Sequence, residues 1–128
     1  MAKPIKRNWR ECRPSVGHDN AIVHHLLNST AKAATATDDA ERQAACLQRL
    51  SGFARHMLQS GMSSNYHSHP NAEQTYYILR GRGALVVDGE RYPVREGDTV
   101  YMPAGAMHQA VNDSDDWMEH LIITAQLG

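Results

Sequence analysis

The sequence predicts an all-β fold, a sandwich or barrel, for most of the chain. Two observations favour this class: many short apolar runs, and turn signals at close spacing between them. The Asp88-Gly89 pair between two apolar runs is also typical of a type I′ hairpin turn, which needs positive φ at both central residues. A chain of 128 residues is the usual size of one domain and can bury a real core.

Residues 1–20 are expected to form an irregular N-terminal arm, with Trp9 anchoring it to the domain. The β-domain is expected over residues 21–128. Its first strand is residues 21–27, a short apolar run with β-branched residues. His24 and His25 are adjacent in this strand, so they face opposite sides and cannot both line one pocket.

Residues 28–50 are expected to leave the sheet and hold a short helix. The segment from Thr37 to Glu41 predicts the helix start, because acidic residues are favourable in the first turn. This excursion is either a lid or a surface insertion. The remaining strands are expected at residues 53–59, 66–69, 74–79, 83–87, 91–94, 99–102, 107–111 and 118–124.

Composition narrows the classes of function. A net charge of -1 does not suggest a nucleic-acid surface or binding to an acidic membrane. The N-terminus lacks the apolar run of a secretory signal, and no apolar stretch approaches the ~20 residues that cross a bilayer. Cys12 and Cys46 lie far apart, which favours a reduced, cytoplasmic protein. Eight histidines are many for this length and point to metal or proton chemistry.

A His-x-His pair, His67 and His69, lies on a predicted strand. Side chains at i and i+2 project to one face, with Cα atoms about 6.6 Å apart, so both imidazoles can meet on one ion. His108 follows a Pro/Gly turn that leads into another strand and can supply a third imidazole. Three imidazoles plus one oxygen ligand, with open positions, is a common arrangement for a mononuclear catalytic metal.

Two blocks of the sequence lie in register: Gly61, His67-Ser68-His69 and Gly81, and then Gly97, Pro103, Gly105, His108 and Asn112. They make the chain resemble the cupin superfamily, in particular its small single-domain members. Gly61, His67-Ser68-His69 and Gly81 match the family's first motif. The resemblance implies a single jelly-roll β-barrel with the metal inside it.

The second block matches the family's second motif at every position: Gly97, Pro103, Gly105, His108 and Asn112. The spacing between the two blocks also resembles that of small cupins. Dimerisation through edge strands and swapped arms is common in the family, so a homodimer is expected.

The acidic ligand position of the first motif departs from the family pattern. The motif places six residues between the acidic ligand and the glycine: six lie between Gln74 and Gly81, whereas seven lie between Glu73 and Gly81. A strand that carries Gln74 inward carries Glu73 outward. We therefore expect Gln74 to be the fourth ligand, through its side-chain oxygen, with Glu73 as the rival.

A ligand set of three imidazoles and one amide is neutral and leaves the ion its full charge. The site is then expected to attract a small anionic, chelating substrate and to stabilise negative charge on its oxygens. One divalent transition metal ion is expected, with Fe, Mn, Ni, Zn and Cu all open. The expected function is an isomerase or lyase that acts on a small carboxylate or sugar acid through a metal-bound enediolate. The alternatives are an Fe(II)-dependent dioxygenase and a non-catalytic binding barrel.

Two further side chains are candidates for catalysis. Tyr76 shares the predicted face of Gln74 and can bond a substrate or donate a proton, although a wall residue would also fit there. His56 is alone on its strand and is either a satisfied barrel histidine or a general acid/base. Trp117 and His120 receive no assignment.

Overall fold

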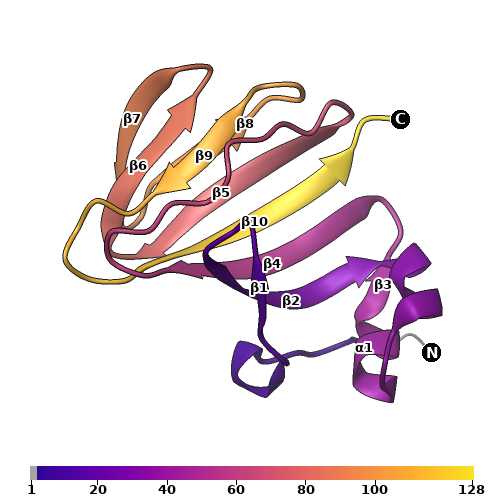
Figure 1. The fold of residues 1–128 in the computed structure, drawn as a ribbon. Coiled ribbons are helices and arrows are strands. Elements are labelled where there is room, and N and C mark those ends of the chain that lie inside the picture. Colours follow the sequence, from indigo (N-terminus) through magenta and orange to yellow (C-terminus); the bar gives the residue numbers. More distant parts are fainter. Residues whose placement is uncertain (1–2) are drawn as a thin grey trace.

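The chain folds into two antiparallel sheets that face each other, as the computed structural model of residues 3–128 shows (Figure 1). The first two residues of the predicted arm lie outside the described residues. The larger sheet has the order β1-β2-β4-β10-β5-β8, with β3 paired to β2, and the smaller has the order β7-β6-β9. The strands are β1 (Ser15–Gly17), β2 (Ala21–Ser29), β3 (Ala45–Leu47), β4 (Leu50–Leu58), β5 (Ala72–Arg80), β6 (Arg82–Val87), β7 (Glu90–Arg95), β8 (Thr99–Met102), β9 (His108–Val111) and β10 (Met118–Gln126). The predicted all-β class is confirmed.

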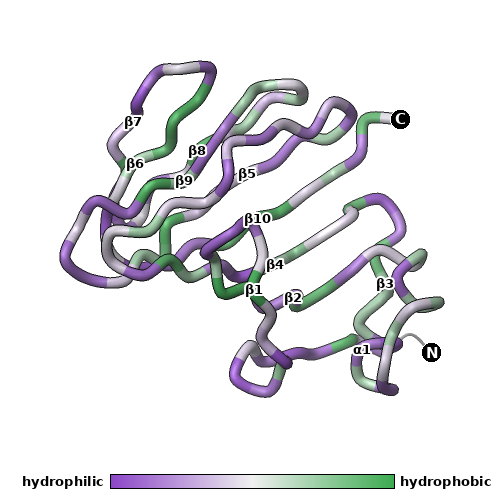
Figure 2. The backbone as a smooth tube through the Cα atoms, viewed as in Figure 1, coloured by the Kyte–Doolittle hydropathy of each residue, from purple (hydrophilic) through white to green (hydrophobic). Residues whose placement is uncertain are grey.

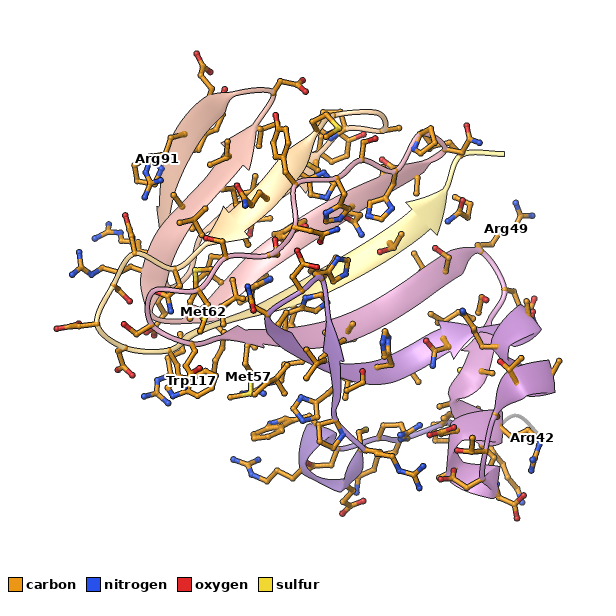
Figure 3. All side chains as sticks on the ribbon, in the orientation of Figure 1. Arg42, Arg49, Met57, Met62, Arg91 and Trp117 are labelled. Atoms are coloured by element: carbon orange, nitrogen blue, oxygen red, sulfur yellow. The ribbon has the colours of Figure 1, made fainter. Side chains whose placement is uncertain are left out.

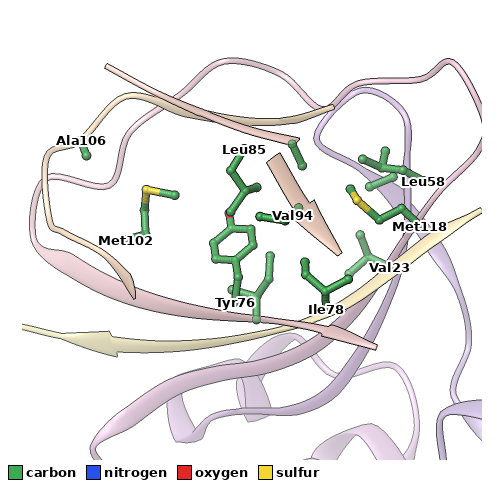
Figure 4. Close-up of a cluster of buried hydrophobic side chains, with 12 residues drawn as sticks. Val23, Leu58, Tyr76, Ile78, Leu85, Val94, Met102, Ala106 and Met118 are labelled. Atoms are coloured by element: carbon green, nitrogen blue, oxygen red, sulfur yellow. The ribbon is translucent and has the colours of Figure 1, made fainter. Parts of the chain in front are cut away.

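The core lies between the two sheets. Leu58, Ile78 and Met118 from the large sheet are fully buried with Leu85 of β6 (Figure 4). On β5, burial alternates residue by residue, as expected of a strand with one face inward. In Figure 2 the hydrophobic stretches fall on strands such as β6, and hydrophilic stretches fall on turns.

The β6–β7 hairpin has the predicted turn. Asp88 and Gly89 have φ values of 47° and 83°, both positive, as a type I′ turn requires. The carboxylate of Asp88 also accepts a hydrogen bond from the backbone N–H of Met107, at 3.0 Å. This bond ties the hairpin to the turn that precedes β9.

One predicted strand is wrong. Residues 66–69 form a loop, and His67 makes only an isolated bridge with His108. Pro70, directly after His69, has no N–H to continue a ladder. The connection from β4 to β5 is therefore longer than expected, and two isolated bridges hold it beside β9.

The N-terminal arm is more regular than predicted. It contains the short 3-10 helix η1 (Trp9–Glu11), and β1 pairs with β2. Trp9 contacts the domain as expected: the guanidinium carbon of Arg55 lies 3.7 Å from its ring centroid. Arg55 is buried and bonds Glu119 at 2.9 Å, so the arm covers the outer face of β4 and β10.

The excursion after β2 holds η2 (Thr30–Thr35) and the predicted helix, α1 (Asp39–Ala44). Asp38 caps α1 by accepting a hydrogen bond from the N–H of Glu41, at 2.8 Å. The short strand β3 was not predicted; it pairs with β2 in parallel and extends the sheet edge.

Charged side chains such as Arg42, Arg49 and Arg91 project outward (Figure 3). Within residues 3–128, no helix has the length and apolar character needed to span a membrane.

Candidate metal centre

His67, His69 and His108 converge, with one nitrogen of each lying within 4.8 Å of the others. Their ring centroids are 4.4–5.4 Å apart. Two backbone hydrogen bonds hold the loop against β9, from His67 N–H to His108 O at 3.0 Å and from His108 N–H to His67 O at 2.7 Å. Gly105 N–H donates to the carbonyl of His69 at 3.0 Å and fixes the second half of the loop.

Hydrogen bonds to backbone carbonyls set the tautomers of two of these rings. Nδ1 of His67 lies 2.9 Å from the carbonyl oxygen of Asn65, and Nδ1 of His108 lies 2.9 Å from that of Ala106. A carbonyl oxygen only accepts, so each Nδ1 carries the proton and each Nε2 keeps its lone pair. Fixing a ring through its other nitrogen is how metal-binding histidines are usually oriented.

Buried side-chain atoms that could bind a metal, and that have no hydrogen-bond partner, support a metal at this point. Nε2 of His69, Nε2 of His108 and Oε1 of Gln74 are buried and have no hydrogen-bond partner. Leaving a buried polar atom unpaired costs about 1–3 kcal/mol, so unpaired nitrogens on two of the converging histidines and an unpaired oxygen on Gln74 call for a ligand. All three atoms are of types that bind a divalent transition metal.

The structure separates the two candidates for the fourth ligand. Gln74 is buried, its Nε2 donates to Thr124 Oγ1 at 3.0 Å, and its oxygen is left free in the cavity. Glu73 lies on the other face of β5, where it accepts a hydrogen bond from the Tyr101 hydroxyl at 2.9 Å. Because Tyr101 is on the exterior, Glu73 is directed away from the three histidines.

A cavity of about 230 Å³ opens beside the site. Its wall includes His67, His69 and Gln74, and it continues across the inner face of the large sheet. Among residues 3–128, no aspartate or glutamate lines it. Its lining is therefore neutral or positive, which favours an anionic ligand.

A row of further aromatic rings extends from the histidine cluster along the cavity. His18 stacks on His67 with centroids 4.8 Å apart and lies 5.3 Å from His56, which lies 5.3 Å from His120. Tyr76 stacks on His120 at 5.5 Å and closes the row. The structure thus places both predicted catalytic candidates, Tyr76 and His56, in the cavity wall.

Burial keeps the side chains of His56, His120 and Tyr76 neutral. Burial, followed by the like charges of His120 and His18, lowers the pKa of His56 to about 2. Burial lowers the pKa of His120 to about 4 and raises that of the Tyr76 hydroxyl well above its usual value. At neutral pH they offer hydrogen bonds rather than charge.

Two members of the row were missed from sequence. His18 enters the cavity from a tight turn, where it has a positive φ of 51° and its Nδ1 lies 3.2 Å from Asn65 Oδ1. His120 was seen but not assigned, because its place depends on β10 lying between β4 and β5. For His18, the sequence offers only the turn signal of residues 17–20.

Comparison with known proteins identifies the family and agrees with the fold. The profile of the cupin domain family matches residues 54–124. An uncharacterized protein of Methanocaldococcus jannaschii is 28% identical over 110 residues, which are 86% of this chain and 77% of that protein.

Two Thermotoga maritima matches add detail. An oxalate-binding protein is 32% identical over 71 residues, 56% of this chain and 59% of that protein, so the match spans less than two thirds of its length. A crystal structure described as a predicted oxalate decarboxylase superposes with a TM-score of 0.74, covering 94% of this chain and 97% of that one. At 24% identity, that structure supports the fold alone.

Proposed function

Because this chain belongs to the cupin domain family, we propose that His67, His69, His108 and Gln74 bind one divalent transition metal ion, at which a small carboxylate is bound and converted. The observation that carries the proposal is the set of unpartnered buried atoms, His69 Nε2, His108 Nε2 and Gln74 Oε1. A bound ion would satisfy all three, and the tautomers of His67 and His108 already leave a lone pair for it.

The ion would act as a Lewis acid for the oxygens of a chelating carboxylate. None of the four proposed ligands is charged, so the ion would keep its double positive charge. The cavity adds no carboxylate within the described part of the chain. Hydroxy-carboxylates and keto-carboxylates fit this environment, because they present two oxygens and a negative charge.

The proposed reaction is a proton transfer at the carbon next to a metal-bound carbonyl or carboxyl group of the substrate, as in an isomerase or a lyase. When a proton leaves that carbon, negative charge develops on substrate oxygen, and neutral donors in a dry site stabilise it. Tyr76 keeps its proton and would donate a hydrogen bond there. His56 is neutral and lines the same cavity, so one of its ring nitrogens would be available to accept the departing proton.

A second candidate function is binding without turnover. The relative that is 32% identical over 71 residues carries the name oxalate-binding protein, which favours this reading for a small carboxylate. The same donor atoms and the same cavity would serve such a binder. The two candidates differ in whether His56 and Tyr76 move a proton.

Exchange of carbon-bound protons separates the candidates. Protein loaded with Mn²⁺, Zn²⁺ or Fe²⁺ is incubated with 2-oxobutanoate in D₂O, and loss of the C3 proton signal is followed by NMR. The enzyme proposal expects metal-dependent exchange that His108→Ala abolishes and His56→Gln slows. Binding by calorimetry without exchange supports the second candidate, oxygen uptake with Fe²⁺ supports a dioxygenase, and failure to bind overturns the proposal.

A further inference from the structure

The inner face of the large sheet carries a row of residues that links the candidate metal centre to its far edge. Gln74 of β5 is paired with Thr124 of β10, Thr124 with Gly52 of β4, and Gly52 with Asn28 of β2. All four line the cavity. With neighbouring strands about 4.8 Å apart, the row is about 14 Å long from Gln74 to Asn28.

Where the row crosses β4, the residues have little or no side chain. Gly52 has none, and Ala54, which also lines the cavity on β4, has only a methyl group. A Cβ atom added at Gly52 would lie 3.9 Å from the side chain of Thr124, an ordinary contact. The small residues therefore leave a channel over β4 without any backbone requirement for glycine.

The channel ends at a cation. Lys32 of η2 lines the cavity together with His25 and Asn28, and it is the one lysine or arginine that does so within residues 3–128. No carboxylate in that range lies within 4.0 Å of its ammonium nitrogen. Glu41, which lines an adjoining recess with Lys32, accepts hydrogen bonds from the backbone N–H and hydroxyl of Thr37.

We propose that the substrate is a dianion whose second anionic group, remote from the metal-chelating head, binds Lys32. The imidazole of His25 and the amide of Asn28 stand beside Lys32 and can donate hydrogen bonds to the same group. This inference rests on the proposed function, because the head of the substrate is bound at the metal. The excursion after β2 then sets specificity, through a cation that the barrel itself does not supply.

The far group can be a carboxylate or a phosphate, since an ammonium binds either as a point charge. Both are consistent with a cavity that no aspartate or glutamate lines within residues 3–128. A monoanion with the same head would leave Lys32 without a partner and would therefore bind more weakly. The contribution of Lys32 should fall with added salt, because the residue is exposed.

Calorimetry on Mn²⁺-loaded protein tests the inference with ligands of equal chain length. The carboxylate pair is 2-oxodecanoate against 2-oxodecanedioate, the phosphate pair is gluconate against 6-phosphogluconate, and glycerate is the short head ligand. The variants are Lys32→Met and, as a matched control, Lys6→Met, which removes the same charge from an exposed position outside the cavity. We expect one of the dianions to bind about tenfold more tightly than its partner, a modest value for a charged hydrogen bond.

Lys32→Met should abolish this advantage, and Lys6→Met should retain it. Gly52→Val should weaken the long dianion and leave glycerate unchanged, because the added side chain enters the channel. If the head ligands bind but neither dianion gains, or if Lys32→Met keeps the gain, the inference is overturned while the proposed function stands. If no ligand binds in the presence of metal, both fail together.

Discussion

The buried histidines predict a steep loss of stability in mild acid. His56 and His120 both line the cavity, and their pKa values are lowered from 6.5 to about 2 and about 4 by burial. The folded protein therefore keeps both rings neutral at pH 5. The unfolded chain does not, because there each ring titrates near its ordinary pKa.

The sign and size follow from proton linkage. Below pH 6.5 the unfolded state binds more protons than the folded state, so the free energy of unfolding falls as pH falls. At pH 5, which is about 1.5 units below the unfolded pKa, each ring costs about 2 kcal/mol. For each ring the loss continues down to its folded pKa, about 4 for His120 and about 2 for His56.

Urea unfolding of metal-free wild type and His56→Gln, at pH 7 and pH 5, measures this effect. The difference in unfolding free energy between the two pH values should be about 2 kcal/mol smaller in the variant. Tyr76→Phe is the matched control, since it alters the same wall but removes no titrating imidazole, and it should keep the wild-type difference. An equal difference in wild type and His56→Gln would refute the reasoning.

Three further predictions concern the fourth ligand, a motif glycine and the arm. Gln74→Leu should weaken metal binding measured by calorimetry at least tenfold, whereas Glu73→Gln should leave it unchanged, because Glu73 bonds Tyr101 outside the cavity; equal effects would contradict the assignment. Gly81→Ala should lower the free energy of unfolding in urea by about 3 kcal/mol or more, because Gly81 has a φ of 80° and an added Cβ would clash with the backbone oxygen of Trp117. Gly97→Ala is the control: its φ is 91° but the space around it is open, so the loss should be about 1–2 kcal/mol. Arg55→Met should lower the free energy of unfolding by about 2–3 kcal/mol at pH 7, because Glu119, which is largely buried, would keep only the exposed Arg80 at 4.0 Å, and a loss below 1 kcal/mol would contradict that role.

Much of the fold could be predicted from local sequence patterns. Alternation and turn residues placed most strands, and Asp88-Gly89 specified its hairpin, because these signals act over a few residues. The strand expected at residues 66–69 failed for a local reason as well, since Pro70 ends pairing there. Even so, the loop brings His67 and His69 close to His108, although not through the strand geometry from which we expected it.

The rest of the site depends on long-range register. His120 faces the cavity because β10 lies between β4 and β5, and that order cannot be read from any one strand. His18 depends on the β1–β2 turn, and Lys32 depends on how the excursion folds back over β2. The expected homodimer stays a prediction, because the fold of one chain does not test it.

The account stands on one ion held by three imidazoles and an amide oxygen. Elemental analysis of the purified protein, followed by calorimetric titration of the metal-free form, tests this directly. The predicted result is one divalent transition metal per chain, with binding lost in His108→Ala and retained in Glu73→Gln. Binding of equal strength in wild type and His108→Ala, or no stoichiometric metal at all, would contradict it.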